Sequence, residues 1–210
     1  MRDAASDIRY LLNRGYPRKG AIKFVCDHYR MDAAGRHILT RVVYSEIVSS
    51  ERRAKLLGCK QAAGSDILID GFNVLISVEC MLQDEPLYMC DDGLVRDTRG
   101  VFHNYRQGSV TGQALSEICT EIRDMGAARV LMLFDSQISK SGELAKKSRQ
   151  HLLSSGITGD AVVSRRVDHD LKSYGRIVAT GDGAVIDAVE KVICIPRCIM
   201  SRLGKKALRI

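Results

Sequence analysis

Acidic residues follow several short apolar runs of this sequence, at the points where buried β-strands would end. They are Asp70, Asp135, Asp168, Asp170 and Asp182. The C-terminal ends of the strands of an open parallel sheet lie on one edge, and ligands bind there. Carboxylates gathered at that edge repel one another, and Mg²⁺ or Mn²⁺ relieves the repulsion because both ions prefer hard oxygen ligands. The pattern predicts a divalent-metal site at one edge of a sheet.

Each of these acids also has a simpler interpretation. A single Asp after a strand is usually the N-cap of the next helix or a turn residue. Asp182, which precedes Gly183, fits that interpretation as well as it fits a metal ligand. The joint occurrence of acids after several predicted strands favours the metal site.

Apolar runs predict the strands that must position these acids, and helical segments separate them. The strands are expected at residues 66–70, 128–134, 161–164, 176–180 and 192–195, and the helices near 112–125, 141–155, 168–174 and 183–190. Continuous apolar strands that alternate with helices are typical of an α/β fold with a parallel sheet covered on both faces. Residues 83–110 lack this periodicity, and we expect an inserted loop or short hairpin there.

The segment before the first strand is expected to form a basic, all-helical domain over residues 1–57. Two apolar stripes at helical spacing support this, Ile22, Val25, Cys26 and Tyr29 in one and Leu39, Val42, Val43 and Ile47 in the next. Asp32 is a candidate N-cap between them. A linker at 58–65, the main domain at 66–195 and a basic tail at 196–210 complete the expected organisation.

The net charge of +7 is unevenly distributed along the 210 residues. Residues 1–60 carry +7, residues 61–195 carry −5 and residues 196–210 carry +5. This distribution suits a polyanion held by basic flanks, with Lys19 and Lys23 among the contacts, around an acidic centre that binds metal. The alternative is that the basic flanks are only solvated surface.

Composition also bears on location. No apolar run approaches the roughly 18 to 20 residues that a membrane helix needs, so no membrane association is expected. Asp3, Asp7 and Arg9 stand where a signal peptide needs apolar residues, which favours a cytoplasmic protein. The seven cysteines are scattered and form no C-x-x-C pair, so we expect reduced thiols. A homodimer is left open.

Three short motifs resemble the PIN-like superfamily, especially its NYN branch. The stretch ILIDGFNVL (67–75) resembles the first strand and its Asp-Gly-x-Asn turn, VATGDGAVID (178–187) is similar to the fourth strand, and RVDHDL (166–171) resembles a helix start that supplies another acid. The resemblance covers residues 66–195. The whole chain also resembles an uncharacterised prokaryotic family that joins a small helical domain, here YLLNRGYPRKGAIKFV, to a PIN-like domain.

The resemblance implies a three-layer fold with strand order 3-2-1-4-5 and a set of site residues. Asp70 and Asp182 would be metal ligands from adjacent strands, and Asp168 would be the third, with Asp170 as its rival. Asn73 would steady a water or a phosphate oxygen. The candidates for one further acid are Glu79, Asp92 and Asp97.

Basic and hydroxyl residues near the same edge are candidates for phosphate binding. They are Ser139, Lys140 and Ser141 at a helix start, Arg96 in the insertion, and Arg165 and Arg166 just before Asp168. Guanidinium groups and helix N-termini both favour phosphate. The alternatives are that one of the serines is an N-cap, that Lys140 is only exposed, and that Arg96 forms a salt bridge with neighbouring acids.

The expected function is that of a Mg²⁺- or Mn²⁺-dependent nuclease, with RNA favoured over DNA by the resemblance. The alternative is a nucleic-acid-binding or regulatory protein with a degenerate, non-catalytic PIN-like fold. A nucleotide-binding or phosphatase-like enzyme is disfavoured, because the sequence has neither a Walker A motif nor a G-x-G-x-x-G after a strand. With 4 Phe, 7 Tyr and no Trp, extensive stacking on bases is not expected.

Overall fold

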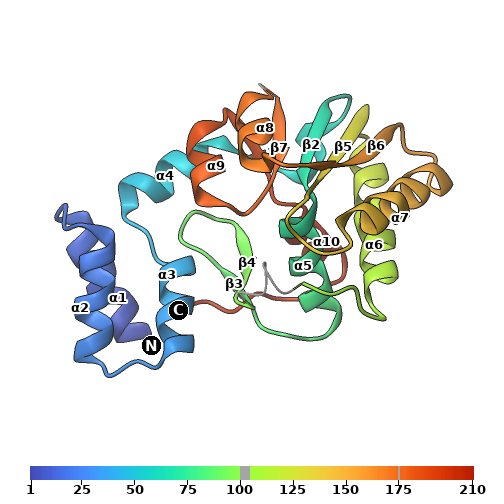
Figure 1. Ribbon diagram of the computed structural model, residues 1–210. Coiled ribbons are helices and arrows are strands. Elements are labelled where there is room, and N and C mark those ends of the chain that lie inside the picture. The colour runs from blue at the N-terminus through green and yellow to red at the C-terminus, as the bar shows by residue number, and fades with distance from the viewer. Residues whose placement is uncertain (100–104, 175) are drawn as a thin grey trace.

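The computed structural model describes residues 1–99, 105–174 and 176–210, and it shows an α/β domain preceded by a helical region (Figure 1). The main sheet has six strands, paired in parallel in the order β1-β8-β7-β2-β5-β6. They are β1 (Leu56–Leu57), β2 (Asp66–Asp70), β5 (Arg129–Asp135), β6 (Gly159–Ser164), β7 (Ile177–Ala179) and β8 (Lys191–Ile193). The predicted α/β class, with its parallel sheet and leading helices, is confirmed. The edge strand β1 falls where the sequence predicts the end of the helical domain.

The strand β2 lies inside the sheet because its centre is continuously apolar. All five of its residues are buried, and Ile67, Leu68 and Ile69 belong to the main hydrophobic core. It pairs with β5 on one side and with β7 on the other. Asp70, its last residue, therefore emerges between two neighbouring strand ends.

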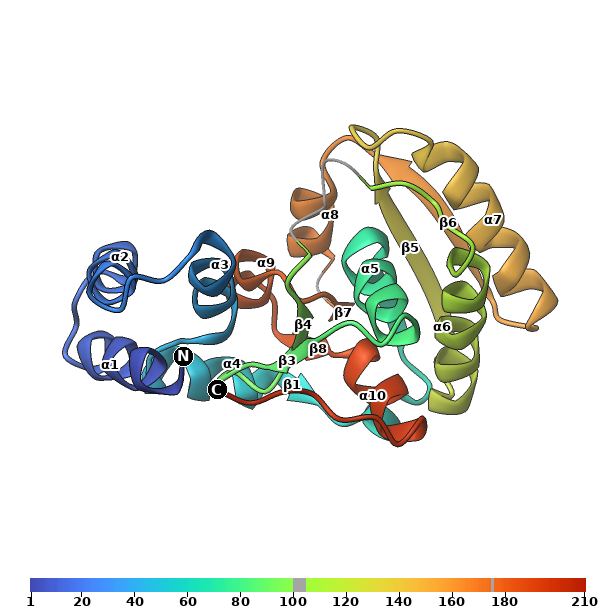
Figure 2. The same ribbon diagram turned by 90° about the horizontal axis from the view of Figure 1, so that it is seen from below.

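Helices after the strands cover both faces of this sheet. They are α5 (Gly71–Leu82), α6 (Thr111–Met125), α7 (Ser141–Ser154), α8 (Val167–Ser173), α9 (Gly183–Ala188) and α10 (Ile195–Arg202). The helices α5, α6 and α10 pack against one another, whereas α8 and α9 form a separate pair (Figure 2). The connections from β2 to β6 and from β6 to β8 cross the sheet in opposite directions, so right-handed crossovers place their helices on opposite faces.

The helical region consists of short helices with their own core. They are α1 (Arg2–Asn13), α2 (Arg18–His28), α3 (Ala33–Val42) and α4 (Glu46–Lys55). Asp32 caps α3 as predicted, because its carboxylate accepts the Gly35 N–H at 2.7 Å. The predicted apolar stripe is wrong at Ile47, which is 68% exposed. The reason is that Val43 adopts an extended backbone that ends α3, so the stripe does not continue into α4.

The predicted insertion contains a hairpin that joins the helical region to the rest of the chain. Strands β3 (Leu87–Met89) and β4 (Val95–Asp97) pair in antiparallel fashion. Tyr88 and Cys90 belong to the core of the helical region, and the Asp91 carboxylate accepts two hydrogen bonds from Arg9 at 2.8 and 2.9 Å. The part of the insertion at residues 100–104 lies outside the described residues.

The C-terminal segment differs from the predicted basic tail. Residues 195–202 form α10, and Ile195, Cys198 and Ile199 are buried in the main core. These apolar residues at helical spacing are what draw the segment onto α5 and α6. The chain then returns to the hairpin, where the Leu208 N–H donates to the Leu87 carbonyl at 2.8 Å.

The cysteines divide into a pair and a set of buried free thiols. A disulfide joins Cys59, in the short 3₁₀ helix η1 (Cys59–Ala62), to Cys198 in α10, so the prediction that all thiols are reduced is wrong for these two. Cys26, Cys80, Cys90, Cys119 and Cys194 are free and buried. Separately, none of the described helices has both the length and the apolar character needed to cross a membrane.

Candidate active site at the C-terminal edge of the sheet

A pocket of about 370 Å³ lies where β2 and β5 end and α8 begins. Its lining residues are Asp70, Asp135, Gln137, Arg165, Arg166, Val167, Asp168 and His169. Three separate segments each contribute one carboxylic acid, and the β6–α8 connection contributes both arginines. The fold thus brings Asp70, Asp135 and Asp168, all predicted as metal ligands, to one pocket.

Asp70 occupies both of the roles that the sequence allows for it. Its Oδ1 accepts the backbone N–H of Asn73 at 3.4 Å and caps α5. Its Oδ2 accepts the hydroxyl of Thr180 at 2.8 Å, because Ile69 pairs with Ala179 and the next residues of both strands lie side by side. The capping interpretation is therefore correct, and it does not remove Asp70 from the pocket.

The electrostatic environment of Asp70 is unfavourable to its charge. Asp70 is only 6% exposed, and this burial raises the pKa of its carboxyl group to about 7. Hydrogen bonds from Thr180 and Asn73 lower this pKa, whereas the charges of Asp182 and Asp168 raise it. A divalent cation in the pocket would reverse the shift, because an opposite charge nearby favours the ionised carboxylate.

Gly71 is required by the close approach of β5 to the start of α5. A Cβ at this position would lie 2.5 Å from a ring carbon of Phe134 and 2.7 Å from the Leu133 carbonyl oxygen. A larger residue would push α5 away from the sheet and move Asp70 with it. Glycine is needed here for space.

Asp182 stands in the turn after β7, next to the Asp70 pocket. Its Oδ1 accepts the Val185 N–H at 3.0 Å and caps α9. The Asn73 side-chain oxygen accepts the Gly181 N–H at 2.6 Å and so holds this turn. That oxygen is used within the fold, and the predicted contact of Asn73 with a water or a phosphate would fall to its side-chain NH₂ group. Asp182 does not line the pocket, although its charge acts on Asp70.

The acids at this edge do not form one compact ligand cluster. Within residues 1–99, 105–174 and 176–210, no three Asp, Glu or His ligand atoms here lie within 4.8 Å of one another. A cation in the pocket would be held by fewer carboxylates and would keep several waters, as Mg²⁺ usually does. Asp70, Asp168 and Asp182, the three predicted ligands, do not form such a group among the described residues.

The helix α8 separates the two rival acids of the RVDHDL motif. Asp168 lines the pocket with Asp70, whereas Asp170 accepts a hydrogen bond from the Ser164 hydroxyl at 2.5 Å and does not line it. Two positions along a helix differ by roughly 200° in direction, so only one of the two acids faces the sheet edge. The geometry favours Asp168.

The candidates for a further acid are all buried and lie outside the pocket. Asp97 accepts the Ser77 hydroxyl at 2.8 Å, and Glu79 accepts the Tyr105 hydroxyl at 2.9 Å. Asp92 is bound by arginines. The structure therefore differs from the prediction of Asp92 and Asp97 as metal ligands, because neither lines the pocket that contains Asp70.

Asp92, Arg52 of α4, Arg96 of β4 and the ring of Tyr44 form a cluster that we call the arginine seam. Arg96 binds Asp92 through two hydrogen bonds of 2.8 and 2.7 Å, and Arg52 adds a third of 3.0 Å. Both guanidinium groups lie over the Tyr44 ring, 4.5 Å from its centroid for Arg52 and 5.5 Å for Arg96. Burial alone would raise the pKa of Asp92, but the bonds from Arg96 and Arg52 outweigh it and hold that pKa below its usual range.

The arginine seam also holds the turn that contains Asp182. Arg96 donates to the Gly181 carbonyl at 2.7 Å, and Arg52 donates to the Gly183 carbonyl at 3.3 Å. Arg96 is only 3% exposed, so it is the salt-bridged residue of the two alternatives and does not reach a phosphate. The helical region thus contacts the sheet edge through a side chain of α4.

Comparison with known proteins places this architecture in a family. The family model described as "Domain of unknown function (DUF5616)" matches residues 59–198, most of the chain. The chain belongs to the DUF5616 family. Residues 1–55 match a second model, "Protein of unknown function (DUF434)". "Uncharacterized protein MJ0935" of Methanocaldococcus jannaschii is 34% identical over 183 residues, 87% of each chain. No solved structure matches the chain.

The predicted phosphate-binding residues of this DUF5616 protein divide into two groups. Arg165 and Arg166 are exposed and line the Asp70 pocket. Ser139, Lys140 and Ser141 lie at the start of α7 and do not line it. Lys140 is exposed and Ser141 is buried, and neither serine caps α7, because its N-cap position is Lys140 and no side-chain cap bond is present there.

Two residues that matter at this edge of the DUF5616 fold are absent from the sequence-based set. Thr180 was detectable in principle, because it follows a strand that pairs with the strand of Asp70. Arg52 carries no comparable signal, since its partners Asp92 and Asp187 lie 40 and 135 positions away.

Proposed function

We propose that this DUF5616 protein is a Mg²⁺- or Mn²⁺-dependent nuclease that hydrolyses RNA. The observation that carries the proposal is Asp70, a buried acid with a pKa raised to about 7 in a pocket that also contains Asp135 and Asp168. Acids with strongly shifted pKa values in a pocket are concentrated at functional sites. The exposed Arg165 and Arg166 give the same pocket groups that bind phosphate.

The residues present fit a hard divalent cation. Carboxylate oxygens are the ligands that Mg²⁺ and Mn²⁺ prefer, and the pocket supplies them from β2, β5 and α8. The hydrogen bonds that Asp70 receives from a hydroxyl and a backbone N–H leave its charge uncompensated, as its raised pKa indicates. Asp70 and Asp168 would hold the ion, and Asp135 lines the same pocket.

The chemistry follows from these positions. A bound cation would lower the pKa of a water molecule and neutralise charge on the scissile phosphate. Arg165 and Arg166 would bind the non-bridging phosphate oxygens and orient the backbone for in-line attack. His169, exposed at the same pocket, would supply a proton to the leaving oxygen.

The helical region offers a surface for the substrate. Tyr10, Tyr16 and Phe24 on α1, α2 and their connection are 58%, 56% and 68% exposed. Lys19 and Lys23 are exposed on α2, where Lys23 is bonded to Asp27. Exposed aromatic rings among basic residues suit unpaired bases and their phosphates. These three exposed rings could stack on unpaired bases.

The sheet supports a PIN-like assignment as part of the proposal. Its central β2 lies between β5 and β7, and Asp70 and Asp182 follow the adjacent strands β2 and β7. This arrangement agrees with the position of the site that the motif resemblance implies.

The test is cleavage of end-labelled single-stranded RNA, and of DNA of the same sequence, in Mn²⁺ and in EDTA. We expect cleavage of RNA in Mn²⁺, no cleavage in EDTA, and strong losses in Asp70→Asn and Asp168→Asn. Asp66→Asn is a matched control, because Asp66 lies at the opposite end of β2 and binds Arg129 and Arg176.

Cleavage by Asp70→Asn at the wild-type rate would contradict the proposal. If wild-type protein binds RNA and cleaves neither substrate in Mn²⁺, the non-catalytic alternative holds instead.

A further inference from the structure

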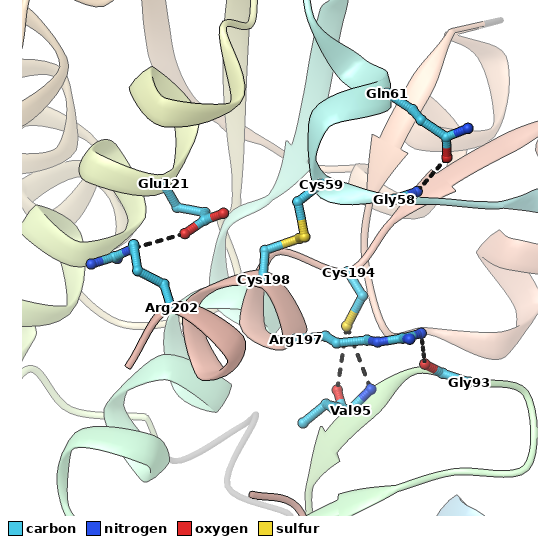
Figure 3. The surroundings of a disulfide bond; sticks show 10 residues. All are labelled: Gly58, Cys59, Gln61, Gly93, Val95, Glu121, Cys194, Arg197, Cys198 and Arg202. Atoms are coloured by element: carbon cyan, nitrogen blue, oxygen red, sulfur yellow. Dashed lines mark hydrogen bonds and ion pairs between the residues drawn. A yellow bond between two sulfur atoms is a disulfide. The ribbon is translucent and has the colours of Figure 1, made fainter. Parts of the chain in front are cut away.

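A second group of ligating side chains lies where the linker, α6 and the last helix meet. Cys59 of η1, Glu121 of α6 and Cys198 of α10 each bring one ligand atom within 4.8 Å of the other two. Cys198 and Glu121 are buried, and Cys59 is half-buried. Figure 3 shows the Glu121 carboxylate beside the Cys59–Cys198 disulfide, on the side away from Cys194.

The donor atoms of this group differ in chemistry from those of the Asp70 pocket. Two thiolates and one carboxylate suit Zn²⁺, which takes four ligands and binds sulfur well. Mg²⁺ and Mn²⁺ prefer sites made only of oxygen ligands. The Cα atoms of Cys59 and Cys198 are 5.8 Å apart, so both sulfurs can reach one ion by side-chain rotation alone.

Arg202 supplies the partner that such a carboxylate needs. Its Nε donates to Oε2 of Glu121 at 2.9 Å, and its Nη2 donates to Glu117 at 2.8 Å. The bond to Oε2 orients Glu121 and leaves its other oxygen for a ligand. A Zn²⁺ ion with two thiolates and one carboxylate has one net negative charge, which the Arg202 guanidinium offsets.

A cavity of about 400 Å³ gives access to the two sulfurs. Cys59 and Cys198 line it together with Arg53, Gly93, Arg197 and others. This cavity offers an entry path to the two cysteines, and Glu121 does not line it. Cys194 also lines it, but its thiol is bonded to both the N–H and the carbonyl of Val95 (Figure 3).

We propose that Cys59, Glu121 and Cys198 bind Zn²⁺ in the reduced protein and that the disulfide is the oxidised, metal-free form of this site. A dithiol reductant gives two electrons and two protons to the S–S bond, which yields two thiols and the disulfide of the reductant. Zn²⁺ then displaces both thiol protons and binds the thiolates. A disulfide oxidant reverses the reduction once the ion has left.

The test uses the full chain, reduced with a dithiol, stripped with a chelator, equilibrated with Zn²⁺ and desalted without oxygen. We expect about one Zn²⁺ per chain by mass spectrometry of the metal. Cys59→Ser and Cys198→Ser weaken binding by at least about 100-fold, and Glu121→Gln by about 10-fold or more. Cys194→Ser, in the same cavity, and Asp70→Asn, in the other pocket, keep wild-type binding.

Three results would overturn this inference, two of them in the metal measurement. One is reduced wild-type protein that retains no Zn²⁺, and the other is a Cys59→Ser/Cys198→Ser double variant that retains as much as wild type. A third measurement uses only reduced wild-type protein, with alkylation of each cysteine mapped by mass spectrometry. Zn²⁺ should slow the alkylation of Cys59 and Cys198 by about 10-fold or more. Equal rates with and without the ion contradict the site.

Discussion

Two buried aspartates of this protein lie in opposite electrostatic environments: one lowers the pKa of its carboxyl group and the other raises it. Asp92, in the arginine seam, is fully buried, yet two guanidinium groups hold its pKa below the usual range. Asp70 is 6% exposed, its carboxylate is bonded to a hydroxyl and a backbone N–H, and burial raises its pKa to about 7. The fold compensates one charge and leaves the other for a ligand to compensate. The comparison therefore supports a structural role for Asp92 and the proposed functional role for Asp70.

One turn connects the two regions. Thr180 at its start donates to Asp70, whereas the carbonyls of Gly181 and Gly183 accept hydrogen bonds from the arginine seam. Substitution of Asp70 should therefore lower activity, whereas substitution in the arginine seam should lower stability.

The largest expected effect is on activity, in Asp70→Asn. We expect kcat for RNA cleavage in Mn²⁺ to fall about 10⁴-fold, equivalent to about 5.5 kcal/mol, because a neutral amide is a poor ligand for a hard cation. Initial rates at saturating substrate measure it. The kcat of Asp66→Asn should stay within about threefold of wild type. Similar losses of kcat in both variants would contradict a specific role for Asp70.

Asp92→Asn should have the largest effect on stability. It leaves Arg96 buried without its carboxylate and removes one of the two carboxylates that bind Arg52, which costs about 3 to 5 kcal/mol of the free energy of unfolding. Urea titration at pH 8 measures the loss. Asp70→Asn, measured in the same way without metal, should gain stability, and a loss of equal size in the two variants would show that the two acids are alike.

The pH dependence of stability should have opposite signs for the two acids. The raised pKa of Asp70 means that its contribution is complete below about pH 4 and is lost as the pH rises through about 7. Without metal, the advantage of Asp70→Asn over wild type should thus grow to about 2 to 4 kcal/mol by pH 8.

For Asp92, whose pKa is lowered, the contribution is present above about pH 4 and is lost as the pH falls further. The deficit of Asp92→Asn should accordingly shrink in acid. Chemical denaturation of both variants and of wild type from pH 3.5 to 8 measures these differences in the free energy of unfolding. If both differences change with pH in the same direction, the two pKa shifts are not opposite.

A smaller effect is expected for Arg52→Lys. Lysine keeps the charge but cannot bind Asp92, Asp187 and the Gly183 carbonyl at once, so we expect a loss of about 1 to 2 kcal/mol. RNA cleavage should fall several-fold, since the turn beside Asp182 is released. Arg53→Lys, at the neighbouring exposed residue, should change stability by less than about 0.5 kcal/mol. If Arg53→Lys is the more disruptive change, α4 does not act through Arg52.

The sequence predicts the part of the structure that depends on local pattern. The apolar run of β2 and its terminal Asp70 are readable because strand ends share an edge, and Asp32 is readable as a cap because capping is local. The resemblance names Asp168 as the third acid with Asp170 as its rival, and the direction in which α8 faces also favours Asp168.

The remainder depends on contacts between distant segments. Arg52 and Asp187 are bonded although they are 135 positions apart in the sequence, and Cys59 and Cys198 are 139 positions apart. No sequence motif predicts either pair. Arg96 is equally compatible in sequence with a phosphate clamp and a salt bridge, and the hairpin decides for the salt bridge by burying it beside Asp92. The segment after residue 195 is misjudged because its basic residues mask the buried face of α10.

Titration calorimetry with Mn²⁺ at pH 8 tests most directly whether Asp70 is the acid reserved for a cation. Wild-type protein and Asp66→Asn should bind Mn²⁺ with the same affinity, and Asp70→Asn should show no heat of binding at millimolar Mn²⁺. If wild type binds no Mn²⁺ at that concentration, or if Asp70→Asn binds it as well as wild type, Asp70 is only the cap of α5.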